Sequence, residues 1–355
     1  MQRIRSLLLI GLVTALAACL PEEEENASPS VPSGDAGDPA SGPHPIVLAH
    51  GMFGQESYLG ILDYWSTVPD VLRAAGHVVY VTEVDPLNSP VVRGERLIEQ
   101  LEALAEANGH AKFIIVGHSQ GGLDIRYVAS TRPDLVEAVL SVASPHYGTP
   151  AVDIARALLE DGATIEAVVN FVVKTFFPLV WDEIGDTTSL YTSLLSMTAE
   201  ATEEFAEAFP DAPGVAYYSI TGVTDRVPMS HPHCAPDLVA PPVARWASER
   251  DPAILPLSIG EALLDDDDLL DVVRNTYPND GLVRAIDTRW GSFLGCLPAD
   301  HAEIIGLTSA ILPGYHPGCH GLCLGTNDTA LCDCNDFDYE LFWVEMLEWL
   351  RERGH

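Results

Sequence analysis

The chain has 355 residues, of which 52 are Asp or Glu and 18 are Lys or Arg, so its formal net charge is −34 with neutral histidines. This charge excludes nucleic acid as a main partner, because phosphate contacts need clustered Lys and Arg. Hydrophobic residues make up 47% of the chain, which is well above the level of disordered proteins and allows a large buried core.

The first 18 residues have the pattern of a secretory signal. Arg3 and Arg5 precede an apolar run from Leu7 to Ala18 that is too short to span a bilayer. The run ends in Leu16-Ala17-Ala18-Cys19, and small residues before a cysteine are typical of a bacterial lipoprotein processing site. We therefore expect residues 1–18 to be removed and Cys19 to carry acyl chains that anchor the protein stably. An ordinary signal cut near Ala18 is the alternative.

A flexible tether is predicted for residues 19–43. From Pro21 to Pro43 the chain contains four glutamates followed mostly by Ser, Pro, Gly, Ala and Asp, so it has almost nothing that could pack. We expect an exported protein that is anchored to the bacterial cell envelope, with the outer membrane as the expected site, or released outside the cell.

Six cysteines remain when Cys19 is subtracted from the total of seven. An even number in an exported chain indicates disulfides, and six cysteines allow 15 pairings. Four lie in a Gly-rich segment at about residues 315–335, namely Cys319, Cys323, Cys332 and Cys334. A local disulfide cluster is expected there. Zinc is the alternative, although thiolates oxidise outside the cytoplasm and the spacing fits no closed zinc module.

Residues 44–355 are predicted to form one domain in which buried strands alternate with helices. Ile46–Ala49 is an unbroken apolar run before a glycine-rich turn, which is typical of a buried parallel strand. Similar runs lie at Val78–Val81 and Phe113–Val116, and helical patterns lie at Trp65–Ala74 and Glu95–Ala107. This order predicts an α/β fold with a doubly wound, mostly parallel sheet. Its ligand site should lie at the carboxyl ends of the strands.

A nucleophile elbow is predicted directly after the strand that begins at Phe113. Gly117-His118-Ser119-Gln120-Gly121 matches the G-x-S-x-G pattern, with a strand before it and an amphipathic helix after it. Small residues let the backbone bend sharply there and lift the serine hydroxyl clear of the sheet. The pattern alone is common by chance, but this position between strand and helix is specific. We therefore predict Ser119 to be a nucleophile.

The partners of Ser119 are expected later in the chain, because serine needs a base and this fold carries the order Ser, Asp, His. Asp280 lies in a turn before an apolar run, and His301 follows 21 residues later beside further acids. We predict Asp280 as the acid and His301 as the base. The alternative is a turn aspartate and a helix cap beside an incidental surface histidine. The fold further predicts two oxyanion donors, Met52 N–H and Gln120 N–H.

These motifs together resemble the foldase-dependent triacylglycerol lipases that Gram-negative bacteria secrete. The likeness is dense from about residue 44 to 150 and returns at Tyr217–Ser219, at Asn279–Val283 and at His301. The resemblance implies an α/β-hydrolase fold, the triad and oxyanion donors named above, and a role for Arg93 in holding the oxyanion loop. It also raises the prospect of a steric foldase as a folding partner.

No organic cofactor is expected, but the resemblance implies a structural calcium ion. Such lipases place an aspartate two residues after the catalytic histidine, where this chain has Glu303. Glutamate also binds calcium through oxygen. The second acid is expected after Tyr217–Ser219, and both Asp225 and Asp237 are candidates.

A helical lid insertion is expected at about residues 150–213, where the resemblance is weakest. Ile165–Phe177 carries apolar residues on nearly every side, too many for a helix that faces water. A lid that covers an acyl pocket in water and contacts lipid when open would explain this composition. A core helix is the alternative.

The sequence as a whole predicts a lipid-anchored triacylglycerol lipase that hydrolyses lipid esters at a lipid–water interface through a serine acyl-enzyme. A short-chain carboxylesterase or a phospholipase on the same triad is the alternative enzyme. A catalytically silent surface lipoprotein that binds lipid is the non-enzyme alternative. It would require a damaged triad, and none is visible in the sequence.

Overall fold

The structure is a computed structural model that describes residues 43–54, 63–150, 152–153, 156, 187–224, 231–248, 277–307, 319–320, 333–334 and 337–355. All of these residues lie in one compact unit, Pro39–His355. The predicted signal with Cys19, the tether up to residue 42, the apolar segment Ile165–Phe177 and the calcium candidate Asp225 lie outside them. Among the described helices, none has the length and apolar composition needed to cross a membrane.

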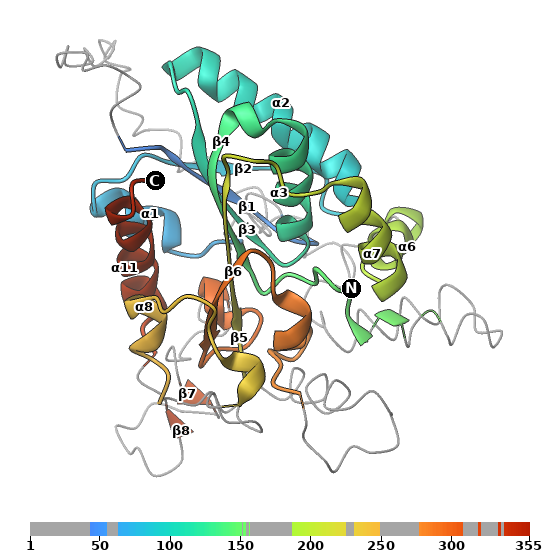
Figure 1. The fold of residues 1–355 in the computed structure, drawn as a ribbon, viewed down its shortest axis with the longest axis vertical. Helices are drawn as coiled ribbons and strands as arrows, with labels where there is room; N and C mark the ends of the chain where they lie inside the picture. The colour runs from blue at the N-terminus through green and yellow to red at the C-terminus, as the bar shows by residue number, and fades with distance from the viewer. Residues whose placement is uncertain are drawn as a thin grey trace, which may run out of the picture. The chain divides into compact units, whose positions relative to one another are not determined.

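A six-stranded sheet forms the centre of this unit (Figure 1). Its strand order is β2-β1-β3-β4-β5-β6, and every neighbouring pair is parallel. The strands are β1 (Ile46–Ala49), β2 (Val79–Thr82), β3 (Phe113–His118), β4 (Val136–Val142), β5 (Ala216–Gly222) and β6 (Ser292–Leu297). The predicted doubly wound parallel sheet is therefore confirmed, and the carboxyl ends of all six strands lie along one edge.

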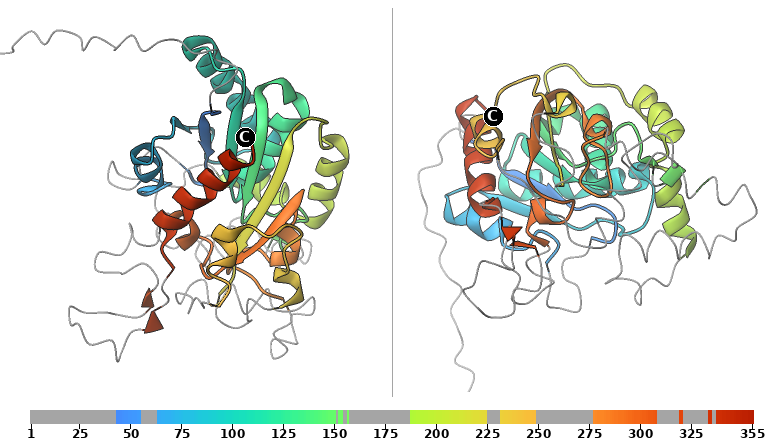
Figure 2. Two further views of the ribbon diagram at one scale, coloured as in Figure 1. Left: turned by 60° about the vertical axis from the view of Figure 1, so that its left-hand side comes forward. Right: turned by 90° about the horizontal axis from the view of Figure 1, so that it is seen from below.

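Helices cover both faces of the sheet, as Figure 2 shows from two sides. Helices α2 and α3 pack on one face, and α1, α8 and α11 pack on the other. The helices are α1 (Val68–Ala74), α2 (Pro90–Asn108), α3 (Gln120–Thr131), α6 (Thr187–Leu195), α7 (Ala199–Ala208), α8 (Pro241–Ala244) and α11 (Tyr339–Glu352). Short 3-10 helices are η1 (Pro133–Leu135), η3 (Pro232–Cys234), η4 (Ala285–Thr288) and η5 (Glu303–Ile305).

The apolar strands are explained by burial on both faces. Along β1, Ile46 and Leu48 pack into the cluster that contains Trp343 of α11, whereas Val47 packs with Leu97 of α2. Successive side chains of a strand point to opposite faces, so a strand covered on both sides needs an unbroken apolar run. Each large side chain that is fully buried in this way stabilises the fold by about 1.5–3 kcal/mol.

Helix α2 begins five residues before the predicted start at Glu95. The Ser89 hydroxyl accepts a hydrogen bond from Val92 N–H at the helix start, and Pro90 occupies the first turn. Proline is favoured there because the first N–H groups of a helix have no intrahelical partner. The hydrophobic period alone does not reveal this turn, because the start depends on the cap and the proline.

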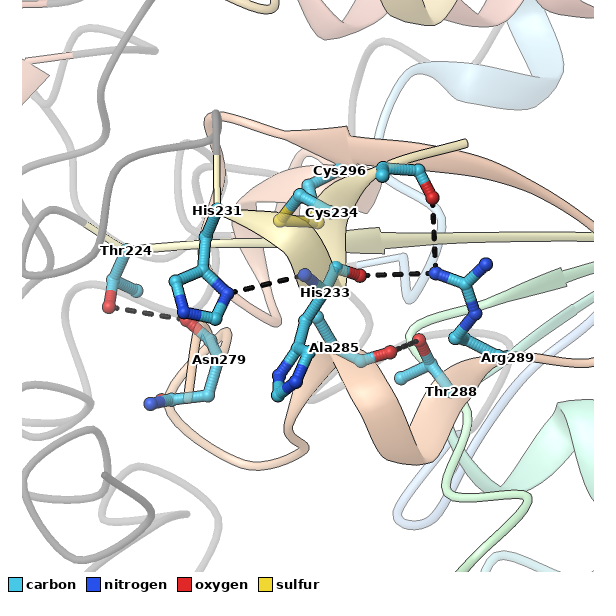
Figure 3. The surroundings of a disulfide bond; sticks show 10 residues. Thr224, His231, His233, Cys234, Asn279, Ala285, Thr288, Arg289 and Cys296 are labelled. Atoms are coloured by element: carbon cyan, nitrogen blue, oxygen red, sulfur yellow. Dashed lines mark hydrogen bonds between the residues drawn. A yellow bond between two sulfur atoms is a disulfide. The ribbon is translucent and has the colours of Figure 1, made fainter. Parts of the chain in front are cut away.

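One disulfide joins Cys234 of η3 to Cys296 of β6 (Figure 3). Beside it, the Arg289 guanidinium donates to the backbone carbonyls of His233 and Ala235. The bond therefore fixes the segment after β5 to the strand that leads toward His301. In the Cys-rich segment, β7 (Cys319–His320) pairs with β8 (Asp333–Cys334) in antiparallel register, which sets Cys319 opposite Cys334.

Removing this disulfide should lower thermal stability. The bonded cysteines are 62 residues apart, and a cross-link over a loop of that length stabilises by about 2–5 kcal/mol. The variant Cys234→Ala/Cys296→Ala should melt roughly 5–15 °C below the wild type. Thermal unfolding followed by circular dichroism measures the shift. A variant that melts with the wild type would contradict a stabilising role for this bond.

Candidate active site

Ser119 stands at a sharp turn between β3 and α3. Its backbone has φ 56° and ψ −128°, a conformation that costs a non-glycine residue about 1–3 kcal/mol. Its N–H donates to Val142 O of β4 at 2.9 Å. The turn needs glycine on both sides, since a Cβ on Gly117 would lie 2.4 Å from Gly121 O and one on Gly121 would lie 2.6 Å from Ala49 O. The elbow predicted from the sequence therefore has the strained geometry of a presented nucleophile.

Asp280 and His301 come together at the same edge of the sheet. His301 Nδ1 donates to Asp280 Oδ2 at 2.7 Å, and His301 N–H donates to Asp280 O at 3.0 Å. The other carboxylate oxygen, Oδ1, accepts the N–H groups of Leu282 and Val283 at 2.9 and 2.8 Å. Both side chains are buried. The carboxylate is thus fixed by backbone donors, and it fixes the imidazole with Nδ1 protonated.

A hydrogen-bonded chain links the elbow to the His301 loop. Tyr64 Oη donates to His118 Nδ1 at 2.6 Å, and His118 Nε2 donates to His301 O at 2.9 Å. The His118 and His301 ring centroids lie 4.7 Å apart. Burial, and then the neighbouring His301, hold the pKa of His118 well below its usual range, so His118 stays neutral with one donor and one acceptor nitrogen. The residue before Ser119 therefore positions the backbone of His301.

The loop after β1 lies directly against the elbow. A Cβ on Gly51 would stand 2.7 Å from Ser119 Cβ. Gly51 O accepts hydrogen bonds from His50 Nδ1 at 2.8 Å, Gly54 N at 3.2 Å and Arg93 Nη2 at 3.2 Å. Because the peptide is trans, the N–H of Met52 must point opposite to this carbonyl. Three donors to one carbonyl oxygen thus fix the direction of the Met52 N–H.

His50 contributes to this loop as a neutral imidazole. Its Nε2 accepts the N–H of Val84 at 3.1 Å while Nδ1 donates to Gly51 O. Burial and the nearby Arg93 guanidinium lower the pKa of His50 to about 3. The histidine therefore keeps the same donor and acceptor across the pH range in which proteins are handled.

Gln120 starts α3 and is fully buried. The first N–H groups of a helix lack intrahelical partners and are free to donate to a bound anion. The Gln120 side chain donates from Nε2 to Asn88 O at 2.7 Å, and Ser193 Oγ of α6 donates to the same oxygen at 2.9 Å. The elbow, the start of α2 and helix α6 therefore meet at one carbonyl.

The residues predicted to hold calcium do not form a complete site in the described part of the chain. Asp237 accepts hydrogen bonds from Arg289 Nη2 at 2.7 Å and from Phe293 N–H at 3.3 Å. Glu303 is buried in η5, and Asp225 lies outside the described residues. Across these residues, no group of three His, Cys, Asp or Glu side chains is arranged to hold a metal ion. Calcium stays a prediction, and no chemical step is assigned to it.

The roles of two residues, Tyr64 and Asp124, could not be predicted from the sequence. Tyr64 lies in the stretch of about residues 44 to 150 where the family resemblance is dense, but nothing in the local sequence shows that it reaches His118. Asp124 reads as an ordinary polar residue in an amphipathic helix, yet the structure buries it against Arg93. Both roles depend on contacts between segments that are far apart in the sequence.

Sequence comparison finds lipases among the relatives of the chain. The family described as palmitoyl protein thioesterase matches residues 45–194. A triacylglycerol lipase of Vibrio cholerae is 36% identical over 188 residues, which are 51% of this chain and 60% of the lipase. A triacylglycerol lipase of Burkholderia plantarii is 31% identical over 174 residues, which are 48% of this chain and 49% of the lipase. The chain thus spans about half the length of these relatives and is homologous to them.

Structural comparison identifies the fold. A metagenomic carboxyl esterase, MGS0156, superposes with a TM-score of 0.55 at 18% identity and covers 87% of this chain and 76% of its own. The Bacillus licheniformis lipase BlEst2 in its mature form superposes with a TM-score of 0.51 at 17% identity and covers 82% and 93%. Together with the sheet order, these matches show that the chain has the α/β-hydrolase fold.

A methyl group on Gly51 should damage turnover more than stability. In Gly51→Ala the new Cβ would lie 2.6 Å from Tyr64 Oη and 2.7 Å from Ser119 Cβ, so the loop must move away from the nucleophile. Displacements of about 1 Å in an active site cost on the order of 100-fold in rate. We expect kcat for p-nitrophenyl butyrate to fall by about that factor.

Gly109→Ala is the control for general destabilisation. Gly109 ends α2 with φ 72°, and its Cβ would enter open space. This variant should lose about 1 kcal/mol of stability while keeping wild-type kcat. Equal kcat values for the two variants would show that the Gly51 loop is not constrained as described.

Proposed function

We propose that this protein is a triacylglycerol lipase or closely related lipid esterase that works through an acyl-enzyme on Ser119. One observation carries the proposal: Asp280 and His301 form a buried hydrogen bond of 2.7 Å, and His118 of the nucleophile elbow holds the backbone of His301 by a second hydrogen bond. A buried carboxylate that orients an imidazole beside an elbow serine is the arrangement that activates serine for acyl transfer.

The proposed reaction uses five groups of this chain. The Ser119 hydroxyl attacks the ester carbonyl carbon while His301 Nε2 accepts its proton, and Asp280 stabilises the resulting imidazolium. The oxyanion of the tetrahedral intermediate is held by the N–H groups of Met52 and Gln120. The intermediate then collapses to the acyl-enzyme, and His301 gives its proton to the departing alcohol. Water repeats the sequence with the same base and releases the fatty acid and free Ser119.

Lipid esters are proposed as substrates because the matched relatives are triacylglycerol lipases, with identities of 31–36% over about half of the chain. The chain carries a strong net negative charge, which favours neutral lipid over anionic bilayers. The apolar segment Ile165–Phe177 is the proposed contact with the lipid–water interface. A carboxylesterase or phospholipase would use the same chemistry on other esters.

A thioesterase is the second candidate, because the palmitoyl protein thioesterase family matches residues 45–194. The same acyl-enzyme route would then release a thiol in place of an alcohol. Hydrolysis of emulsified trioctanoin and of p-nitrophenyl esters from acetate to palmitate should be compared with hydrolysis of palmitoyl-coenzyme A. We expect higher kcat/KM on the oxygen esters. A strong preference for the thioester would replace the lipase assignment with the thioesterase one.

Loss of any triad residue should remove most of the activity. Ser119→Ala and His301→Ala should lower kcat by about 10⁴ to 10⁶-fold, because nucleophile and base act as a unit. Asp280→Asn should lower kcat by about 10⁴-fold, because an amide favours the wrong imidazole tautomer. Circular dichroism checks that each variant is folded. Near wild-type hydrolysis by a folded Ser119→Ala protein would remove Ser119 from the mechanism.

We further propose that the enzyme is lipid-anchored through Cys19, on the evidence of the Leu16–Cys19 sequence and the arginines before it. In a bacterial host fed labelled palmitate, the wild type should carry the label and sediment with membranes. Cys19→Ala should lose the label and release active enzyme into the soluble fraction. Label that persists in Cys19→Ala would contradict the anchor and leave the hydrolase assignment untouched.

A further inference from the structure

The buried guanidinium of Arg93 connects three segments of the chain. Arg93 lies in α2, and its side chain is fully buried. Its Nη2 donates to His50 O at 2.7 Å and to Gly51 O at 3.2 Å, and its Nη1 donates to Asp85 O. These carbonyls belong to the loop after β1 and to the segment after β2. The guanidinium therefore sets the orientation of the loop that carries Met52.

Asp124 fixes Arg93 from the opposite side. It lies on α3, five residues after Ser119, and no part of its side chain is exposed. Its Oδ2 accepts Arg93 Nε at 2.9 Å and lies 2.8 Å from Arg93 Nη2. Nε and Nη2 form one edge of the planar guanidinium, so a carboxylate on that edge determines the plane in which the remaining donors point. The nucleophile helix thus controls the direction of the donors that hold the Gly51 carbonyl.

A gain in stability does not explain why the Asp124 carboxylate is buried. Moving an aspartate and an arginine out of water costs several kcal/mol each, and apolar residues of similar size often stabilise a protein as well or better. The Oδ1 atom of Asp124 receives no hydrogen bond from the described residues. Burial raises the pKa of Asp124 to about 6 against the opposing effect of Arg93. The pKa of Asp124 is higher in the folded protein than in the unfolded one. Ionisation of Asp124 therefore lowers the free energy of unfolding as the pH rises toward neutrality.

We propose that Asp124 is a positioning residue for the oxyanion hole. It acts through Arg93: the carboxylate sets the plane of the guanidinium, which holds the His50 and Gly51 carbonyls and thereby aims the Met52 N–H. The inference rests on the proposed serine hydrolase activity. It adds a connection from the helix that begins at the nucleophile to the loop that carries one of the two oxyanion donors.

The test measures how well the oxyanion site fits a tetrahedral ligand. Phenylboronic acid adds to an active-site serine and places a hydroxyl group where the oxyanion forms, so its inhibition constant reports the geometry of the site. Asp124→Asn keeps the size of the side chain but not its charge. In the full chain we expect kcat for p-nitrophenyl butyrate and affinity for phenylboronic acid both to fall by about 10- to 100-fold. KM should change less than twofold.

Glu137→Gln is the matched control. Glu137 lies near the amino end of β4, at the edge of the sheet opposite Ser119, and pairs with Lys112 at 3.2 Å. This substitution also replaces a carboxylate by an amide in an ion pair, so it reproduces the chemical change away from the site. We expect its kcat, KM and boronate affinity to match those of the wild type.

Several outcomes would overturn the inference. It fails when folded Asp124→Asn keeps the wild-type affinity for phenylboronic acid, whatever its stability. It also fails when the affinity for phenylboronic acid falls by the same factor by which KM rises. When Asp124→Asn does not fold, Arg93→Lys decides: lysine balances the Asp124 charge but cannot reach the carboxylate and both carbonyls together. Wild-type boronate affinity in Arg93→Lys would contradict the proposal. Failure of the proposed function is seen separately, as a wild type without Ser119-dependent hydrolysis.

Discussion

The left-handed backbone of Ser119 is the constraint on which the rest of the site depends. A positive φ at a serine is unfavourable by itself, so the surroundings must hold it. They do so with a backbone hydrogen bond to β4 and with glycines at two positions, Gly117 and Gly121, where a side chain would collide with the backbone. The parallel sheet supplies the rigid frame for this turn. The serine is presented because the strand and helix that flank it are buried on nearly every side.

Around this turn, two buried histidines are each held in one protonation state. His50 and His118 are buried and have pKa values far below neutrality, so each donates through one nitrogen and accepts through the other. Arg93 and Asp124 add a pair of buried groups of opposite charge that face each other. The result is an interior in which hydrogen-bond directions are fixed in advance, although the chain as a whole is strongly acidic. Preorganised donors of this kind account for much of the rate enhancement of many enzymes.

Local features of the fold could be predicted from the sequence wherever a local cause dominates. The bounds of β1 follow from an apolar run next to a glycine-rich turn, and the elbow follows from small residues between strand and helix. Asp280 and His301 could be chosen because the fold restricts their order along the chain. The Tyr64–His118–His301 chain and the Asp124–Arg93 pair could not, because they join segments that are far apart in sequence and have no local pattern. The start of α2 at Pro90 shows the same limit on a smaller scale, since a cap and not a hydrophobic period sets it.

The hydrogen bond from His118 to His301 spans 183 residues, and this separation bears on how the protein reaches its active form. The loop-closure entropy of long-range contacts must be overcome before those contacts stabilise the fold, so topologies rich in them fold slowly. Ser119 follows β3 and His301 follows β6, so these two residues come together only when both strands are in the sheet. Activity in a refolding experiment would therefore report completion of the whole topology.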